Sequence, residues 1–513
     1  MRAPTGPGPL EATIFDEALR ARPAFFVALG LIVHAALWTM VPWLADPTPH
    51  PKIAIGLALG HEWQIGYAAT PPLAPWLLEI VYRATGRIAA THFLAPFSVA
   101  LAGWFVFALA RRVVGDRQGA LATFLMVGIF PVAFPVGPFD SNLVQMPLIA
   151  GAVLAWWRVV RERSLPAWFG LTLALVALAY AGLQGLFVLA TLAGLTLASE
   201  SGRSVFRPQE MLLAALLAFC TFLLLLTPRL LWLTDHGFAG LMQGPDAGVE
   251  PGAQIDALGL AFGVLAGHIG LFLLVVLAAP IRIAKRETAS ALLRPPLDRF
   301  VWTTVIVLAL LPALFAWTTA AFIGGRFQVG AAAPLVLYSG LLVIVLAPSV
   351  LHVHHQRAAA FAAMTLLFLP PVFEVTSAFA APWIGEGGRA TNWPAGAAGR
   401  YVKEVFRTRT GKPLEFVIGD ARTASAIALA RGARPHVFLD ADPARSPWID
   451  QDKLKAAGAV VVWPIEGVNV SPPFMLAANL PPLTPEAPLS FNWIRPGRLD
   501  PVRLGWAIIP PTR

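Results

Sequence analysis

Eleven apolar runs fill the first 377 residues of the chain, and they are almost free of Asp, Glu, Lys and Arg. About 20 apolar residues are needed for one helix to cross the hydrocarbon core of a bilayer. Each run is therefore predicted to be a transmembrane helix, and the chain a polytopic α-helical membrane protein. The predicted spans are Ala24 to Trp43, His92 to Ala110, Gln118 to Val136, Asn142 to Trp157, Ala167 to Leu183, Gln184 to Ser199, Met211 to Thr227, Ala257 to Ala279, Phe300 to Ala320, Ala331 to Ala347 and Ala358 to Ser377.

The composition agrees with this class and excludes several others. Hydrophobic residues make up 57% of the 513 and charged residues only 13%, against about 25% charged in soluble domains. A single cysteine, Cys220, rules out a disulfide-stapled secreted module. The formal charge of +9 is better explained by positively charged loops on the cytoplasmic side of a membrane than by nucleic-acid binding.

The distribution of Lys and Arg sets the predicted orientation. We interpret Ala167 to Ser199 as a hairpin of two short helices, because its centre reads Gly182-Leu183-Gln184-Gly185. With that hairpin, 17 Lys and Arg residues outside the spans fall on one face and 5 on the other before residue 378. The N-terminal segment 1–23 is therefore expected in the cytoplasm, the first helix is expected to stay as an anchor, and 24–377 forms the membrane domain.

The tail, 378–513, has a different character. An odd number of spans places it outside the cytoplasm. Its apolar runs are short and alternate with helix-like segments, which predicts a small α/β domain. The expected strands are Glu415 to Gly419, His436 to Asp440, Ala459 to Trp463 and Val502 to Ile509, with helices at Thr423 to Arg431 and Asp450 to Ala457.

Two outer connections are long enough to carry function. The first, 44–91, is amphipathic and Pro-rich and is expected to lie along the membrane interface. The second, Pro228 to Asp256, is Gly-rich and loop-like. Ionisable groups at membrane depth are candidates for function, and those of this chain gather at the outer face. They are Asp46, Lys52, His61, Glu62, Asp140, Arg229 and Arg326.

Five of these residues also have a purely structural interpretation. Asp46 precedes a proline and could end a helix. Glu62 could be a solvated residue of an interfacial helix, and Asp140 could cap the helix that follows it. Arg229 and Arg326 could extend towards lipid headgroups.

A second acidic pattern lies in the tail. Asp440 and Asp442 form an Asp-x-Asp at the end of a predicted strand, a pattern with which some glycosyltransferases hold a metal and a nucleotide sugar. A solvated Asp-Ala-Asp-Pro turn explains it equally well. No phosphate-binding Gly-rich loop, zinc motif or serine-nucleophile motif accompanies it.

The first outer loop carries a family resemblance. The run from Leu59 to Leu77, with Gly66-Tyr67 followed by Pro71-Pro72-Leu73, resembles the corresponding loop of bacterial polyprenyl-phosphate-sugar glycosyltransferases of the C-type fold. These are protein O-mannosyltransferase-like enzymes and include the lipid A aminoarabinose and galacturonic acid transferases. The segment Pro228 to Phe238 is similar to the end of their seventh helix, and Asp140 matches the position of a family acidic residue.

The resemblance implies that a sugar leaves an undecaprenyl-phosphate carrier for a lipid, polysaccharide or protein hydroxyl at the outer face of a bacterial inner membrane. The chemistry needs a general base, for which Asp46, Glu62 and Asp140 are the candidates, and cations for the leaving phosphate. Trp63 and Tyr67 would contact the sugar or hold the loop, together with Pro71 and Pro72. The candidate cations are Arg229, Arg326 and Lys52.

The chain departs from the family where the loop acid is expected. Ungapped alignment places Lys52 and Ile55 there, and Thr70 stands where a Lys or His is usual. A catalytically degenerate relative that binds a lipid-linked sugar or a partner enzyme therefore stays an alternative, and a lipid or sugar transporter a second one. No metal ligands are assigned, although a divalent ion, Mg²⁺ or Mn²⁺, is compatible with the reaction. The expected partners are the lipid-linked sugar, its acceptor and membrane lipids, and no nucleic acid.

Overall fold

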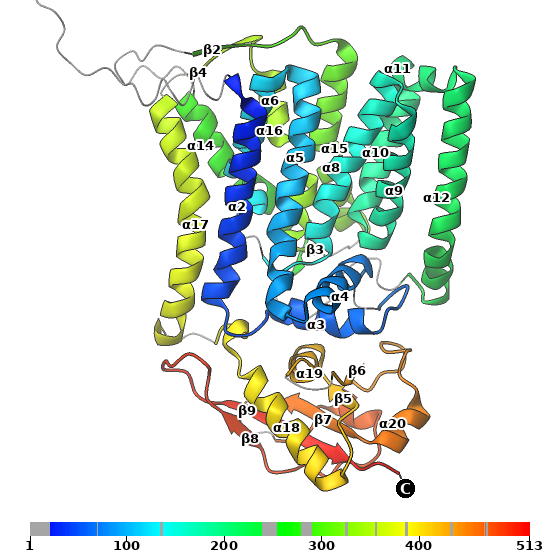
Figure 1. The fold of residues 1–513 in the computed structure, drawn as a ribbon, viewed down its shortest axis with the longest axis vertical. Coiled ribbons are helices and arrows are strands. Elements are labelled where there is room, and N and C mark those ends of the chain that lie inside the picture. Colours follow the sequence, from blue (N-terminus) through cyan, green and yellow to red (C-terminus); the bar gives the residue numbers. More distant parts are fainter. Residues whose placement is uncertain are drawn as a thin grey trace, which may run out of the picture.

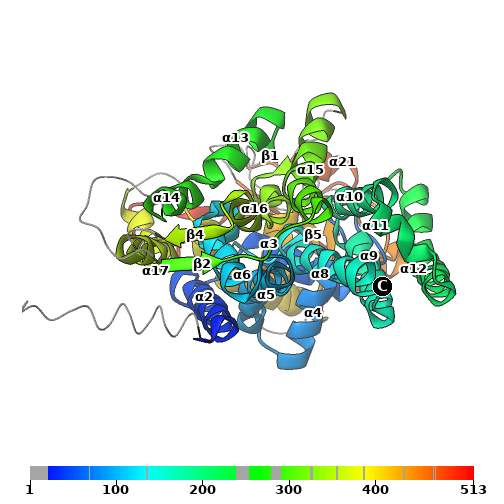
Figure 2. The same cartoon turned by 90° about the horizontal axis from the view of Figure 1, so that it is seen from above.

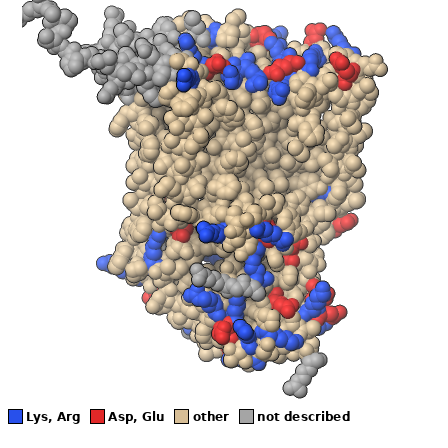
Figure 3. All heavy atoms as spheres, viewed as in Figure 1, with Lys and Arg blue, Asp and Glu red and all other residues tan. Residues whose placement is uncertain are grey.

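The computed structural model describes residues 21–512 except 69, 134–136, 239–253, 279–289, 324–326, 354–355, 385–387, 431–433, 466 and 468–469. It consists of a helical domain and, beyond one end of it, a smaller domain built around a sheet (Figure 1). A broad belt of the helical domain shows almost no charged side chains, whereas charges crowd both of its ends (Figure 3). This distribution is that of a protein whose helices cross a bilayer.

Seven helices of the described part are long and apolar enough to cross a membrane, and a bent pair, α10 with α11 and η3, raises the number to eight. Two shorter apolar helices, Leu165–Ala181 and Ala331–Leu346, accompany them. The number of eleven spans therefore stays a prediction, although every predicted run contains helix. The helices are α2 (Pro23–Ala45), η1 (Ile88–Phe93), α5 (Leu94–Val114), α6 (Asp116–Phe124), η2 (Leu125–Gly128), α7 (Phe130–Ala133), α8 (Ser141–Glu162), α9 (Leu165–Ala181), α10 (Gln184–Ala198), α11 (Glu200–Arg203), η3 (Ser204–Phe206), α12 (Gln209–Asp235), α13 (Ala257–Gly267), α14 (Ile269–Ala278), α15 (Arg299–Ile323), η4 (Val329–Leu335), α16 (Ser339–Leu346) and α17 (Gln356–Ile384).

The third predicted span, Gln118 to Val136, is not one continuous helix. It is divided into α6, a 3-10 turn and the single turn α7. At Gly128 the backbone lies so close to α14 that an added Cβ would be 2.5 Å from the backbone N of Leu271. This backbone contact replaces the regular helix, and apolar composition alone gave no sign of it.

The second predicted outer loop begins later than expected. α12 continues through Pro228 to Asp235, so the stretch from Pro228 to Asp235 is helical and not a loop. A proline inside a membrane helix is tolerated where neighbouring groups satisfy the freed carbonyl. Pro228 leaves the Leu224 carbonyl without its helical N–H donor, and at the next residue the Tyr180 hydroxyl donates to the Leu225 carbonyl at 2.9 Å.

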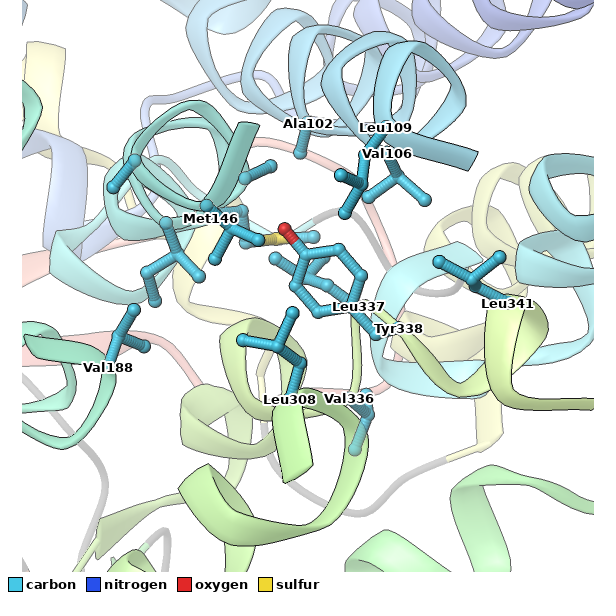
Figure 4. Close-up of a cluster of buried hydrophobic side chains, with 14 of the residues drawn as sticks. Ala102, Val106, Leu109, Met146, Val188, Leu308, Val336, Leu337, Tyr338 and Leu341 are labelled. Atoms are coloured by element: carbon cyan, nitrogen blue, oxygen red, sulfur yellow. The ribbon is translucent and has the colours of Figure 1, made fainter. Parts of the chain in front are cut away.

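Figure 2 shows the helical domain from above. Helices α5, α8 and α16 lie near its centre, and other helices surround them. Their side chains form an apolar core. Figure 4 shows Tyr338, immediately before α16, surrounded by side chains of α5, α8 and α15. Close packing at this centre fixes the positions of the helix ends that carry the polar residues.

The first outer connection forms two helices, α3 (Pro51–His61) and α4 (Leu73–Thr85). Both lie across the end of the helical domain, between it and the sheet domain, as expected for an interfacial segment (Figure 1). α3 is buried along nearly its whole length, because α4 and the sheet domain cover it. The predicted amphipathic connection is therefore an internal layer rather than a free surface.

The C-terminal domain holds a five-stranded sheet in the order β6-β5-β7-β9-β8. β6, β5 and β7 are parallel, and β9 pairs antiparallel with both β7 and β8. All four predicted strands and both predicted helices are present, which confirms the small α/β domain. The elements are η5 (Ala390–Asn392), α18 (Ala395–Thr410), β5 (Phe416–Gly419), α19 (Ala421–Ala428), β6 (His436–Leu439), α20 (Gln451–Ala457), β7 (Ala459–Pro464), α21 (Phe474–Ala478), β8 (Leu489–Phe491) and β9 (Val502–Ile509).

Two small sheets complete the fold. β1 (Gln254–Ile255) pairs with β3 (Phe327–Gln328), and β2 (Ser290–Leu293) pairs with β4 (Val350–Val353). Helix α19 packs its Ala421, Ala424 and Ile427 against Ile55 and Leu59 of α3. This contact joins the two domains at the end of the helical domain that faces the sheet domain (Figure 1).

Candidate functional site

A cavity of about 410 Å³ lies where the helical domain meets the sheet domain. Its walls come from the end of α2, the start of α3, η1 and α5, the loop before α8, α17 and η5. Five of its polar lining residues are titratable. They are Asp46, His50, His92, Glu374 and Arg389.

Asp46 is the carboxylate of this cavity that the sequence singled out. Its backbone N–H donates to the Pro42 carbonyl at 2.9 Å and so ends α2. Burial raises the pKa of Asp46 above its ordinary value, against a hydrogen bond with Thr391 and the positive charge of Arg389, which act in the other direction. Asp46 is thus both a helix-ending residue and a cavity carboxylate with an increased affinity for protons.

Lys52 and Asp140 form an ion pair, and His50 and Phe139, close to them in sequence, line the cavity. The Lys52 Nζ lies 2.8 Å from the Asp140 Oδ2, and the side chains are 21% and 10% exposed. The other oxygen of Asp140 caps α8 by accepting from the backbone N–H groups of Asn142 and Leu143, at 3.0 and 3.2 Å. The capping interpretation of Asp140 is therefore correct, and the same carboxylate also holds Lys52.

His50 connects the pair to the cavity, and sequence reasoning missed it. Its Nδ1 accepts from the backbone N–H of Lys52 at 3.2 Å, and the ring lines the cavity. Burial lowers the pKa of His50 to about 3, and the positive charges of Lys52 and Arg422 act in the same direction. His50 therefore presents a neutral imidazole to the Asp46 cavity at physiological pH.

Glu374 and Arg389 were also missed. The Arg389 guanidinium lies 2.7 Å from the Glu374 carboxylate, across the gap between α17 and η5. Glu374 lies inside the last predicted apolar run, where a single carboxylate could have been noticed as a costly group at membrane depth. Arg389 comes from the tail, and only the tertiary structure brings it to the cavity.

Glu62 does not join this cavity. Its carboxylate is 8% exposed and lies 2.8 Å from the Nδ1 of His436, at the start of β6. The hydrogen bond to Glu62 raises the pKa of His436 above its ordinary value. The structure thus places Glu62 at the junction of the two domains rather than on a solvated helix face.

A second carboxylate of the junction is Glu79 on α4, which is fully buried. Its oxygens accept from Arg434 at 3.1 and 3.0 Å and from Arg83 at 2.7 Å. Arg434 also donates to the Leu57 carbonyl at 2.7 Å. We call Glu79, Arg83, Arg434 and the neighbouring His61 the junction cluster.

The Gly66-Tyr67 loop is held by buried hydrogen bonds. Tyr67 is 1% exposed, and its hydroxyl accepts from the Gln64 backbone N–H at 3.1 Å. Trp63 stays 42% exposed under the guanidinium of Arg83. The two prolines, Pro71 and Pro72, are buried directly before α4.

Arg229 lies beneath this loop. Only 1% of it is exposed, which excludes a side chain extended to lipid headgroups. Its Nη1 donates to the Ile65 carbonyl at 3.3 Å, and its guanidinium lies 4.9 Å from the centre of the Trp232 ring. The structure therefore places Arg229 as a support of the loop, while Arg326 lies outside the described residues.

The close approach of this loop makes Gly66 a sensitive position. An added Cβ would lie 2.3 Å from Trp232 and 2.4 Å from the Arg229 Nη1. We expect Gly66→Ala to displace the loop and to lower the free energy of unfolding by about 1 to 3 kcal/mol, as overpacking does. Thermal unfolding of the purified variant measures this, with Gly194→Ala as the control, because a Cβ there meets nothing within 4 Å. Equal melting temperatures for the two variants would contradict the close contact.

The Asp-x-Asp of the tail is a turn. Asp440 pairs with Arg445, and the backbone N–H of Ala444 donates to Asp442 at 2.8 Å. Both Asp440 and Ala441 have a positive φ. Within the described part of the chain, no group of three or more His, Cys, Asp or Glu side chains could hold a metal ion.

Comparisons with known proteins found a family that matches part of the sequence and a solved structure that has a similar fold. Residues 69–232 match the family described as dolichyl-phosphate-mannose-protein mannosyltransferase, a segment that includes Asp140 and Arg229. The crystal structure of ArnT from Cupriavidus metallidurans bound to undecaprenyl phosphate has the same fold, with a TM-score of 0.54 at 12% identity. That alignment covers 94% of this chain and 98% of the ArnT chain. No curated protein matches the chain in sequence.

Proposed function

We propose that this protein, which is like the C-type membrane glycosyltransferases in its matched segment and in its fold, moves a sugar from a polyprenyl phosphate to an acceptor hydroxyl. The acceptor class is a lipid, polysaccharide or protein of the cell envelope, and the reaction takes place at the periplasmic face of a bacterial inner membrane. The greater number of Lys and Arg residues on the opposite face supports that orientation. The observation that carries the proposal is the cavity, with Asp46 in its wall and the Lys52–Asp140 pair beyond His50.

The cavity and the Lys52–Asp140 pair next to it together have the groups that such a transfer needs. The acceptor oxygen attacks the anomeric carbon, the bond between that carbon and the phosphate oxygen breaks, and the acceptor proton must go to a base. Asp46 is suited to take it, because its carboxylate lines the cavity and burial raises its pKa. The released polyprenyl phosphate carries away the bonding electrons as negative charge.

Lys52 is suited to stabilise that charge. It stands where the family has an acidic residue, and its ammonium group is fixed by Asp140 at 2.8 Å. A cation held in place before the reaction stabilises developing phosphate charge more effectively than a mobile one. Lys52 is then a functional replacement and not a sign of lost activity. The proposal gives no role to a divalent metal, and transfer is expected to persist in a chelator.

The test uses the purified protein in lipid nanodiscs with a panel of radiolabelled undecaprenyl-phosphate sugars and a bacterial membrane-lipid extract as acceptor. We expect transfer from at least one donor and a loss of about 10²-fold in Lys52→Ala. Lys455→Ala, on the exposed face of α20, is the matched control and should keep the wild-type rate. Donor binding without transfer across the panel would favour the degenerate relative, and translocation of the donor without transfer would favour a transporter.

A further inference from the structure

The turn between α9 and α10 carries a buried amide side chain that the proposed reaction does not use. Gln184, the first residue of α10, donates through its Nε2 to the Asn142 Oδ1 at 3.1 Å. Its Oε1 accepts from the Nε2 of Gln145 at 2.8 Å. Asn142 lies two residues after Asp140, and its Nδ2 lies 3.5 Å from the Asp140 Oδ2. Three amides therefore connect the hairpin turn to the carboxylate that holds Lys52.

Backbone groups fix the direction of this chain of hydrogen bonds. The N–H of Gly185 donates to the Gln145 Oε1 at 3.1 Å, and the Nε2 of Gln145 donates to the Ser141 carbonyl at 3.0 Å. A backbone N–H can only donate and a carbonyl can only accept, so the orientation of the Gln145 amide is determined. Each following amide then has only one orientation that satisfies its neighbour, and Asn142 must present its NH₂ group to Asp140.

The chain lies away from solvent. Gln145 is 0%, Asn142 5% and Gln184 6% exposed. A buried amide that makes no hydrogen bond destabilises the folded state. Turning one of these amides by 180° would place its NH₂ group against the NH₂ group of its neighbour, so the observed orientation is strongly favoured. Gly182 makes room for the chain, since an added Cβ would lie 2.8 Å from the Gln145 Nε2, and its φ of 148° is in the region that favours glycine.

We propose that Asn142, Gln184 and Gln145 form a directed amide chain that keeps the Asp140 Oδ2 turned towards Lys52, and that Gln184 is thereby a positioning residue for Lys52. The proposal rests on the proposed function, because it gives the chain the task of holding the cation for the leaving phosphate. Asp140 is then a fixed anion that accepts hydrogen bonds and is not the base of the reaction. The hairpin of α9 and α10 then helps to position Lys52 through Gln184, besides setting which side of the membrane the following segments reach.

Chemical labelling of Lys52 tests the chain without relying on turnover. An N-hydroxysuccinimide ester is applied briefly to the protein in nanodiscs, and the modified Lys52 is quantified by mass spectrometry. An ammonium group held against a carboxylate must leave it before it can react. We expect Asp140→Asn to raise the labelling rate about tenfold and Gln184→Leu to raise it about threefold, the effect of weakening one hydrogen bond to a charged group.

Two further variants control for the loss of a buried amide. Gln118→Leu removes an equally buried amide from α6, at the opposite end of the helical domain, and should leave the labelling of Lys52 unchanged. Gln145→Leu cuts the chain one residue further from Asp140 and should give a smaller rise in the same direction. It also serves as the test if Gln184→Leu fails to fold.

The outcomes separate the two proposals. Wild-type labelling in both Gln184→Leu and Gln145→Leu would overturn the amide chain, and so would wild-type labelling in Asp140→Asn. The expected labelling pattern in a protein that transfers no sugar would support the chain and refute the proposed function. When transfer is present, Gln184→Leu should lower it about threefold, in step with the labelling, and Gln118→Leu should not.

Discussion

Replacing Asp46 by Asn is expected to lower the rate of sugar transfer by about 10² to 10⁴-fold, the usual contribution of a general base. Asn has nearly the same size and can keep a hydrogen bond with Thr391, so the cavity should remain intact. It cannot take the acceptor proton. The initial rate of transfer in nanodiscs measures this loss, and donor binding should change little.

The control for Asp46→Asn is Asp116→Asn. Asp116 is half-exposed at the opposite end of the helical domain, where it pairs with Arg111 at 3.0 Å. The wild-type rate should also fall as the pH is lowered through the pKa of Asp46, and because burial raises that pKa the fall should begin above the range of an ordinary aspartate. If Asp46→Asn keeps full activity, Asp46 is not the base and our assignment is wrong.

Replacing Glu79 by Gln should have the largest effect on stability. The variant leaves Arg434, which is 14% exposed, without its buried carboxylate. Breaking a buried ion pair by removing one partner costs about 3 to 5 kcal/mol. The two domains meet at this junction cluster, so we expect a lower melting temperature and faster proteolysis between α17 and α18.

The effect of Glu79→Gln should depend on pH in a defined direction. Burial acts to raise the pKa of Glu79, but the neighbouring His61 and the hydrogen bonds from Arg83 and Arg434 outweigh it and lower the pKa to about 2. A carboxylate with a lowered pKa stabilises the folded state above its unfolded pKa, here 4.5, and the stabilisation is lost as the pH falls towards 2. The difference in the free energy of unfolding between the wild type and Glu79→Gln should therefore be largest at pH 7 and should shrink below about pH 4.5.

The control for this prediction is Glu200→Gln. Glu200 is 81% exposed and lies 3.9 Å from Arg207, so its loss should cost less than about 1 kcal/mol. Equal shifts of the melting temperature in the two variants at pH 7 would show that the junction cluster does not hold the domains together.

The sequence by itself determined the class of the protein and most of its elements. Apolar length identifies a membrane helix because a lipid environment forces every backbone hydrogen bond to be made within the segment. The hairpin could be located from the glycines at its centre, Gly182 and Gly185, and the strands of the tail from their short apolar runs. Gly66 and Asp140 were found because a family resemblance and a helix start mark them in the chain itself.

Only the tertiary structure decided which polar residues meet. Lys52 and Asp140 are 88 positions apart, and Arg434 and Glu79 are 355 apart, so no local pattern relates them. The sheet domain and α4 cover the apparently interfacial α3 and make it a buried layer, and the cavity gathers Asp46 with Arg389 of the tail. The physical reason is that hydropathy describes the preference of each side chain for water or for an apolar environment. The partner of a buried charge depends instead on how the helices and the sheet pack together.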